Sequence, residues 1–254
     1  MNKLQEIIGY KQTEISERKE TIPLHSLQSR PFYNRDTFSL TERIRNAENG
    51  FGIIAEFKRR SPSAGPINES LDPVDAARSY LQNGAAGISV LTDEKYFGGT
   101  LHDLERIRAA VRIPLLRKDF IIDEYQLHEA KAHGADAVLL IADVLSASDL
   151  RHLFNRASGL GLECLVEIYE KEHIEKLDFG TMRLIGINNR DLRTFRVDLN
   201  HTKEIMQYIP GETLVISESG IQSHDDIEMV KRTGARGALI GEYFMKQGYD
   251  ETFH

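Results

Sequence analysis

The sequence lacks tryptophan and contains a single cysteine, Cys164. One cysteine excludes an intramolecular disulfide and a zinc cluster, and it fits a reducing compartment, so we expect a cytoplasmic protein. No apolar run approaches the length of a membrane-spanning helix, and the charged start of the chain lacks the apolar core of a signal peptide. The sequence therefore predicts no association with a membrane.

An excess of positive charge is also missing. The 32 lysines and arginines face 39 aspartates and glutamates, for a net charge of −7. This balance argues against nucleic acid or an anionic membrane surface as the main partner. The 41% apolar and 28% charged residues are typical of a globular domain. A small anionic substrate fits only if cations gather locally against the overall sign.

Short apolar runs alternate with amphipathic stretches past residue 50. The runs are leucine-rich or β-branched and apolar on both faces, as buried parallel strands are. They lie at 53–57, 88–91, 113–116, 137–141, 164–168, 184–187, 214–217 and 238–240. Helical stretches are predicted between them, at 73–84, 100–111, 123–134, 146–161, 170–177, 198–209 and 223–234.

Eight strand signals with intervening helices predict an α/β fold, a (β/α)8 TIM barrel, with a doubly wound sheet as the alternative. The number of strands favours the barrel. No linker-like run divides the chain, so we expect residues 1–254 to form a single domain. Residues 1–50, predicted to be helical at 2–19 and 36–48, form an N-terminal extension packed on it. No long exposed apolar stripe is present, and we expect a monomer.

Polar side chains occur where the predicted strands end, and in a barrel the catalytic residues lie at these carboxyl ends. They are Glu56, Lys58, Lys118, Asp119, Glu167, Asn188, Arg190, Glu218 and Ser219. Strand alternation puts Glu56 with Lys58, and Asn188 with Arg190, on the same side. A single Lys–Glu pair has an equally good structural explanation, but five of eight strand ends with polar groups predict an active site.

The stretch LLRKDF (115–120) is the most informative of these strand ends. Leu116 and Lys118 share one side by alternation, which carries the lysine into the mouth of the barrel. Arg117 and Asp119 are expected to face the outer layer and to hold the end of the strand.

Two glycine-containing turns resemble phosphate cradles. ESGI (218–221) follows the seventh predicted strand, and LIGE (239–242) follows the eighth and begins the last helix. Gly220 and Gly241 let backbone N–H groups approach phosphate oxygens. Glu242 should contribute only its N–H, with its side chain pointing away.

The loops after the first two strands carry further candidates. In residues 58–72, Lys58 and Ser61 lie nearest the strand end, whereas Arg59 and Arg60 are expected to be solvated. In residues 92–100, Phe97 is a candidate for contact with an apolar or aromatic ligand. Tyr96 fits either a ligand contact or a loop anchor packed on a neighbour.

The series AEFKRRSPS, LTDEKYFGG, LLRKDFIID, ADAVLLI, LVEI, GINNRDL, SESGI and LIGE resembles the indole-3-glycerol phosphate synthase family. The N-terminal segment LQEIIGYKQTEISERK is similar as well, so the resemblance covers essentially the whole chain. It implies a monofunctional enzyme that closes 1-(2-carboxyphenylamino)-1-deoxyribulose 5-phosphate to indole-3-glycerol phosphate, releasing CO2 and water, with no metal and no organic cofactor.

The resemblance also implies residue roles. Lys118 would be the acid of ring closure and Glu167 the general base, with Lys58, Glu56 and Asn188 in the catalytic group. Ser61, Phe97, Phe120, Leu139, Arg190, Glu218 and Ser219 would contact the substrate, and Gly220, Gly241 and Glu242 its phosphate. Ala64 departs from the family pattern, because many members have lysine there, and the last helix is short.

Two other functions are compatible with a phosphate-binding barrel. One is a related isomerase such as phosphoribosylanthranilate isomerase, which needs a different acid–base pair from that in LRKDF and LVEI. The other is a barrel that binds a sugar phosphate without catalysis. The presence of both Lys118 and Glu167 favours the enzyme.

Overall fold

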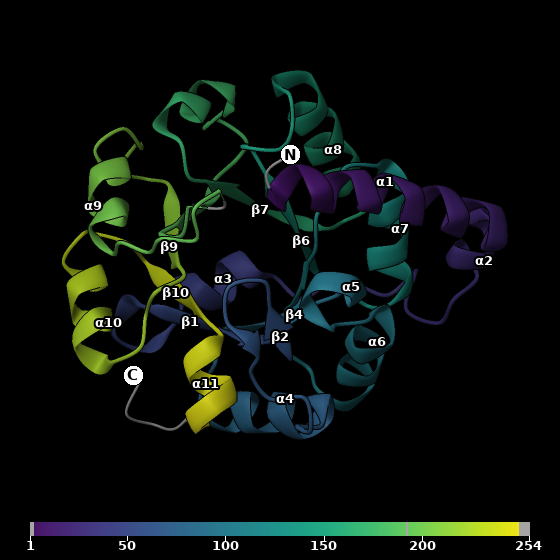
Figure 1. Cartoon of the computed structure of the whole chain (residues 1–254), viewed down its shortest axis with the longest axis horizontal. Helices are drawn as coiled ribbons and strands as arrows, with labels where there is room; N and C mark the ends of the chain where they lie inside the picture. Colours follow the sequence, from purple (N-terminus) through teal and green to yellow (C-terminus); the bar gives the residue numbers. More distant parts are fainter. Residues whose placement is uncertain (1–2, 192, 249–254) are drawn as a thin grey trace.

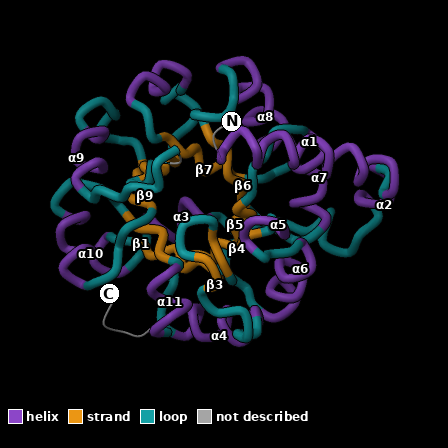
Figure 2. The backbone as a smooth tube through the Cα atoms, viewed as in Figure 1, coloured by secondary structure: helices purple, strands orange, loops and turns teal. Residues whose placement is uncertain are grey.

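Eight parallel strands close into a ring in the computed structural model, which describes residues 3–191 and 193–248 (Figure 1). The order around the ring is β1-β10-β9-β8-β7-β6-β5-β4, so that β10 pairs with β1 and completes the barrel. Figure 2 shows the strands at the centre and the helices outside them. The predicted (β/α)8 barrel is confirmed, and the doubly wound alternative is wrong.

The barrel strands are β1 (Gly52–Phe57), β4 (Gly87–Leu91), β5 (Leu115–Lys118), β6 (Ala137–Ile141), β7 (Glu163–Ile168), β8 (Leu184–Asn188), β9 (Leu214–Glu218) and β10 (Gly237–Ile240). The helices after β1 are α4 (Pro73–Gln82), α5 (Glu94–Phe97), α6 (Leu101–Ala110), α7 (Glu124–Ala132), α8 (Ala147–Gly159), the 3-10 helix η2 (Lys171–Lys176), α9 (Asn200–Met206), α10 (His224–Lys231) and α11 (Glu242–Gln247). A short hairpin follows β1, made of β2 (Arg60–Ser61) and β3 (Gly65–Pro66).

The N-terminal extension contains α1 (Lys3–Thr21), α2 (Leu24–Gln28), α3 (Leu40–Arg45) and the 3-10 helix η1 (Glu48–Gly50). Leu40 and Ile44 of α3 are fully buried at the amino-terminal end of the barrel. A side chain at Gly87 would place its Cβ 2.5 Å from Leu40, so glycine at the start of β4 admits α3. In Figure 1, α1 (purple) lies beside α7 and α8. No helix among the described residues is both long and apolar enough to cross a membrane.

Several predicted elements differ from the structure in their ends or their type, among them the third strand and two helices. The third strand begins at Leu115 rather than residue 113, because Leu115 is the first residue to pair with Ile88 of β4, and Lys118 is its last residue. The helix predicted at 36–48 is limited to α3, where the Ser39 side chain accepts a hydrogen bond from the Glu42 N–H and sets the start. The helix predicted at 170–177 is the 3-10 helix η2.

Alternation along the strands divides the core into two layers. One side chain set fills the barrel interior and includes Ile54, Leu116, Leu139, Leu165, Leu184, Ile216 and Leu239. The other packs between strands and helices and includes Ile53, Val90, Leu115, Val138, Val166, Ile187 and Val215. Two-residue spacing therefore carries Glu56, Lys118, Glu167 and Glu218 inward, above Ile54, Leu116, Leu165 and Ile216.

Candidate active site

A cavity at the carboxyl end of the barrel collects the polar strand ends. Its lining contains every predicted site residue: Glu56, Lys58, Ser61, Phe97, Lys118, Phe120, Leu139, Glu167, Asn188, Arg190, Glu218, Ser219, Gly220, Gly241 and Glu242. It also contains residues that the sequence did not single out, among them Leu91, Ile141, Phe195 and Gln222. Leu91 and Ile141 end their strands, so the same rule identifies them, whereas Phe195 lies in a loop with no such signal.

Lys118 is at the centre of the polar group. Its Nζ donates to Oε2 of Glu167 at 2.6 Å and to Oε2 of Glu218 at 2.7 Å. The other oxygen of Glu167, Oε1, accepts a hydrogen bond from Asn188 Nδ2 at 3.1 Å. Strands β5, β7, β8 and β9 thus each place one polar group in a single connected cluster.

Lys118, Glu167 and Glu218 shift one another's pKa values. Burial alone would lower the pKa of Lys118, but Glu167 and Glu218 outweigh it and hold that pKa above its usual value. Burial would raise the pKa of Glu167, yet the Lys118 ammonium holds it below its usual value. For Glu218, burial is only partly offset by Lys118 and is reinforced by Glu167, which raises its pKa to about 8. At neutral pH the cluster is one ammonium, one carboxylate and one neutral acid.

A second ion pair lies across the cavity at the end of β1. Lys58 Nζ donates to Glu56 Oε1 at 2.5 Å, as the strand alternation predicts. Glu56 Oε2 accepts a weaker bond from Ser89 Oγ at 3.3 Å. A side chain at Gly241 would place its Cβ 2.6 Å from Glu56 Oε1, so glycine there leaves room for the carboxylate.

Glycine at position 186 is required by Glu218. A Cβ at Gly186, on β8, would lie 1.9 Å from Glu218 Oε1. Gly186→Ala should therefore push the Glu218 carboxylate off Lys118 and lower the free energy of unfolding by about 1–3 kcal/mol, as overpacked cores do.

Thermal unfolding of Gly186→Ala measures the loss of stability, and its kcat measures the consequence of displacing Glu218. The matched control is Gly9→Ala on α1, where a Cβ meets nothing within 4 Å. If Gly186→Ala unfolds like the wild type and keeps its kcat, the Glu218 side chain does not need this space.

The turns after β9 and β10 offer backbone donors to the cavity. Ser219 and Gly220 have positive φ, at 70° and 85°, and turn the chain sharply after β9. Gly241 precedes the first turn of α11, and the Glu242 carboxylate accepts from Lys246 Nζ at 2.7 Å on the same helix. The Glu242 side chain is thus engaged with its own helix. N–H groups at these two turns and the nearby Arg190 can meet an anion.

Aromatic and loop contacts form the remaining wall. The rings of Phe97 and Phe120 are 6.1 Å apart between centroids. Tyr96 is the loop anchor of the two alternatives, because it is buried and its hydroxyl donates to Glu6 Oε1 at 3.1 Å. The expectation that Arg59 and Arg60 are solvated is wrong. Arg59 binds both oxygens of Asp103 at 2.6 and 2.8 Å, and Arg60 donates to the carbonyls of Glu94 and Lys95; these bonds tie the two loops together.

The prediction that Arg117 and Asp119 face the outer layer and hold the end of β5 is confirmed. Arg117 is fully buried and donates to the Gln126 carbonyl and to Glu129 on α7. The Asp119 carboxylate accepts from Arg117 and from Thr92. Within the described residues, no three His, Cys, Asp or Glu side chains are grouped as metal ligands.

Matches to known proteins agree on the family of the chain. Residues 4–253 match the family model described as indole-3-glycerol phosphate synthase. A protein of that name from Salinibacter ruber is 44% identical over 97% of this chain and 91% of its own length. One from Rhodopirellula baltica is 51% identical over 77% of this chain and 75% of its own, and one from Geobacillus kaustophilus is 43% identical over 96% and 92%.

Proposed function

The chain belongs to the indole-3-glycerol phosphate synthase family and is a carboxy-lyase that forms indole-3-glycerol phosphate, and from this premise we propose how its residues carry out the reaction. The substrate, 1-(2-carboxyphenylamino)-1-deoxyribulose 5-phosphate, has three recognisable parts. The phosphate binds at the turns of Gly220 and Gly241, with Ser219, Arg190 and the Glu242 N–H beside them. The benzoate ring lies against Phe97, Phe120 and Leu139, and its carboxylate meets Lys58 and Ser61.

Lys118 is the acid of ring closure. As the ring carbon that bears the carboxylate attacks the ketone carbon, the C=O π electrons move to oxygen, which takes a proton from the Lys118 ammonium. The attack leaves an iminium in the ring system. Loss of CO2 returns the electrons of the broken C–C bond to that iminium, so the substrate supplies its own electron sink.

Glu167 is the base of the dehydration that follows. It removes the proton from the carbon next to the new hydroxyl-bearing carbon, and the hydroxyl leaves as water with a proton from Lys58, which Glu56 holds in place. The aromatic indole results. Glu218 supplies the proton that returns Lys118 to its ammonium form, because a neutral acid 2.7 Å from the amine is its nearest donor.

The observation that carries this proposal is the ammonium of Lys118 between an ionised and a neutral glutamate, inside a cavity lined by phosphate-type turns. Acid and base thus stand side by side at neutral pH. The test follows the rise of indole fluorescence from the anilino-ribulose phosphate. The chain has no tryptophan, so the protein background is small. No rise in fluorescence with the wild type would refute the activity.

We also propose that the protein acts as a monomer in the cytoplasm, as a single domain over residues 1–254, without a cofactor and without a nucleic acid partner. The net charge of −7 supports the absence of a nucleic acid partner, and the single cysteine supports the cytoplasm. Sedimentation at working concentration distinguishes the monomer from a dimer.

The raised pKa of Glu218 predicts the alkaline side of the pH profile. An acid with a pKa of about 8 is neutral below that pH and ionised above it. Ionisation adds a negative charge beside an anionic substrate and removes the proton that Lys118 needs. The value of kcat/KM should therefore fall as pH rises through about 8.

The profiles of the wild type and Glu218→Gln test this assignment, since glutamine resembles the neutral acid but cannot ionise. The fall near pH 8 should disappear in the variant. An unchanged fall in Glu218→Gln would assign it to another group.

A further inference from the structure

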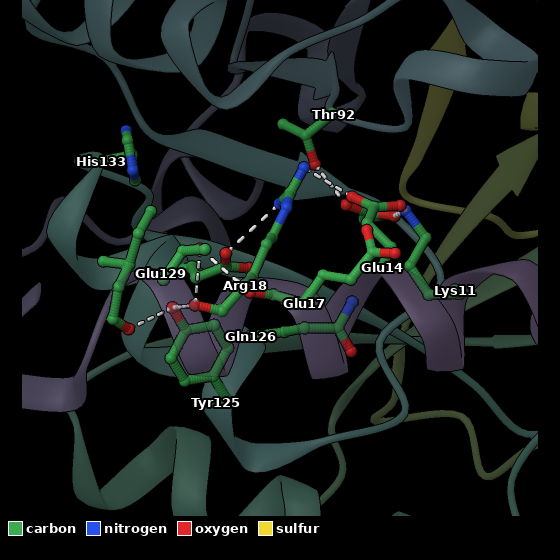
Figure 3. A network of polar contacts seen from close by, with 12 residues as sticks. Lys11, Glu14, Glu17, Arg18, Thr92, Tyr125, Gln126, Glu129 and His133 are labelled. Carbon is green, nitrogen blue, oxygen red and sulfur yellow. Dashed lines mark hydrogen bonds and ion pairs between the residues drawn. The ribbon is translucent and has the colours of Figure 1, made fainter.

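Lys11 of α1 is a buried ammonium outside the cavity. It is 1% exposed, and its Nζ lies 2.9 Å from Glu14 Oε2 and 3.0 Å from both Asp93 Oδ2 and Asp119 Oδ1. Figure 3 shows Lys11 and Glu14 projecting from the helix toward the group that includes Thr92. A buried charge is unfavourable unless it is paired. The three carboxylates around Lys11 provide that pairing.

Asp119 connects Lys11 to the reacting centre. It stands between Lys118 and Phe120 in the chain. Its Oδ1 accepts the Phe120 N–H at 2.8 Å as well as Lys11, and its Oδ2 accepts from Thr92 Oγ1 at 2.6 Å and from Arg117 at 3.0 Å. The orientation of this carboxylate therefore fixes the backbone between the lysine at the end of β5 and the aromatic residue of the cavity wall.

Asp93 connects Lys11 to the neighbouring loop. Its Oδ1 accepts the Tyr96 N–H at 2.8 Å and caps α5, the short helix that carries Phe97. The Phe97 ring in turn lies 6.1 Å from that of Phe120. One ammonium thus joins the chain after β4 to the chain after β5, the two segments that supply this aromatic pair.

The two arginines near this group, Arg117 and Arg18, are both engaged with Glu129. Arg117 touches Asp119 but is also bound to Glu129, which Arg18 contacts from α1. Burial raises the pKa of Asp93, and Lys11 partly offsets this. For Asp119, burial is outweighed by Lys11 and Arg117, and its pKa is well below the usual range. Without Lys11, two buried carboxylates would face each other.

We propose that Lys11 is a positioning residue for the ring-closure reaction: through Asp119 and Asp93 it holds Lys118, Phe97 and Phe120 in register from the N-terminal helix. It touches none of the reacting atoms. The inference rests on the proposed role of Lys118, and it gives the N-terminal extension a specific part in the chemistry of the cavity.

Lys11→Met tests the inference, with Lys19→Met as the matched control. Lys19 lies on the same helix and also pairs with a loop carboxylate, Asp123 at 2.7 Å, but its side chain is 45% exposed. We measure kcat at saturating substrate, at a temperature where circular dichroism shows each protein to be folded. Lys11→Met should lower kcat by about tenfold or more, because a misplacement near 1 Å is costly. Lys19→Met should stay within about twofold.

A purely structural role would lower the unfolding temperature of Lys11→Met and leave kcat of the folded protein unchanged, and that result would overturn the inference. Should Lys11→Met fail to fold, Asp93→Asn takes its place, because it weakens the tether and keeps the helix cap; kcat should again fall, and an unchanged kcat overturns the inference. Lys118→Gln in the same assay separates the two proposals. Full activity there refutes the role of Lys118, whereas its loss beside a fully active Lys11→Met refutes only the positioning role.

Discussion

Lys118→Gln is expected to lower kcat on the order of 10³-fold, within the range for loss of a general acid. In the proposed mechanism the ammonium donates to the ketone oxygen while the new C–C bond forms, and an amide cannot replace that proton. The change also removes the cation that holds the pKa of Glu167 below its usual value, so less of this base is ionised at neutral pH. Indole fluorescence under saturating substrate measures the loss directly.

Lys95→Gln is the control for this variant. Lys95 lies on α5 near the mouth, is exposed, and places its Nζ 3.8 Å from the centroid of the Tyr10 ring. Its removal should change kcat by no more than about twofold. Equal rates for Lys118→Gln and the wild type would show that another group protonates the ketone.

Glu167→Gln is expected to separate the two halves of the reaction. Glutamine has one acceptor oxygen instead of two, so it keeps the hydrogen bond from Lys118 or that from Asn188 but not both. The size of the side chain is retained, but the proton acceptor is lost. Ring closure and decarboxylation precede the step that needs this base, so CO2 should still be released in the first turnover. Indole formation should slow on the order of 10²–10³-fold.

Single-turnover measurements of CO2 and of fluorescence in the same mixture distinguish the two steps. Glu172→Gln, an exposed glutamate of η2, should release CO2 and form indole together, as the wild type does. If Glu167→Gln slows both signals equally, Glu167 acts at or before ring closure and is not the dehydration base.

The inward-facing site residues could be predicted from the sequence because the strands follow simple alternation. Glu56, Lys118 and Glu167 each stand two positions beyond an interior aliphatic residue, and the barrel brings these positions to one mouth. The third strand begins two residues later than its pattern predicts. A shift of two residues leaves each side chain on the same face, so the prediction for Lys118 is unaffected.

Contacts between distant segments could not be predicted in the same way. Arg59 looks like a solvated loop residue until Asp103 is seen to bind it. Lys11 lies in a charged helix, and nothing local indicates that two aspartates far along the chain enclose it. The need for Gly186 likewise depends on a carboxylate from the neighbouring strand. Each of these features is decided by tertiary packing rather than by local pattern.

The central claim is that Lys118 protonates the ketone oxygen while Lys58 binds the substrate carboxylate. A bound substrate analogue tests this claim most directly. The analogue keeps the phosphate and the benzoate and carries a hydroxyl in place of the ketone, so it cannot cyclise. A crystal structure of the complex should place Lys118 Nζ within hydrogen-bonding distance, about 2.6–3.2 Å, of that oxygen, with Lys58 Nζ toward the carboxylate. Lys58 bound to the oxygen, with Lys118 still held only by Glu167 and Glu218, would contradict the account.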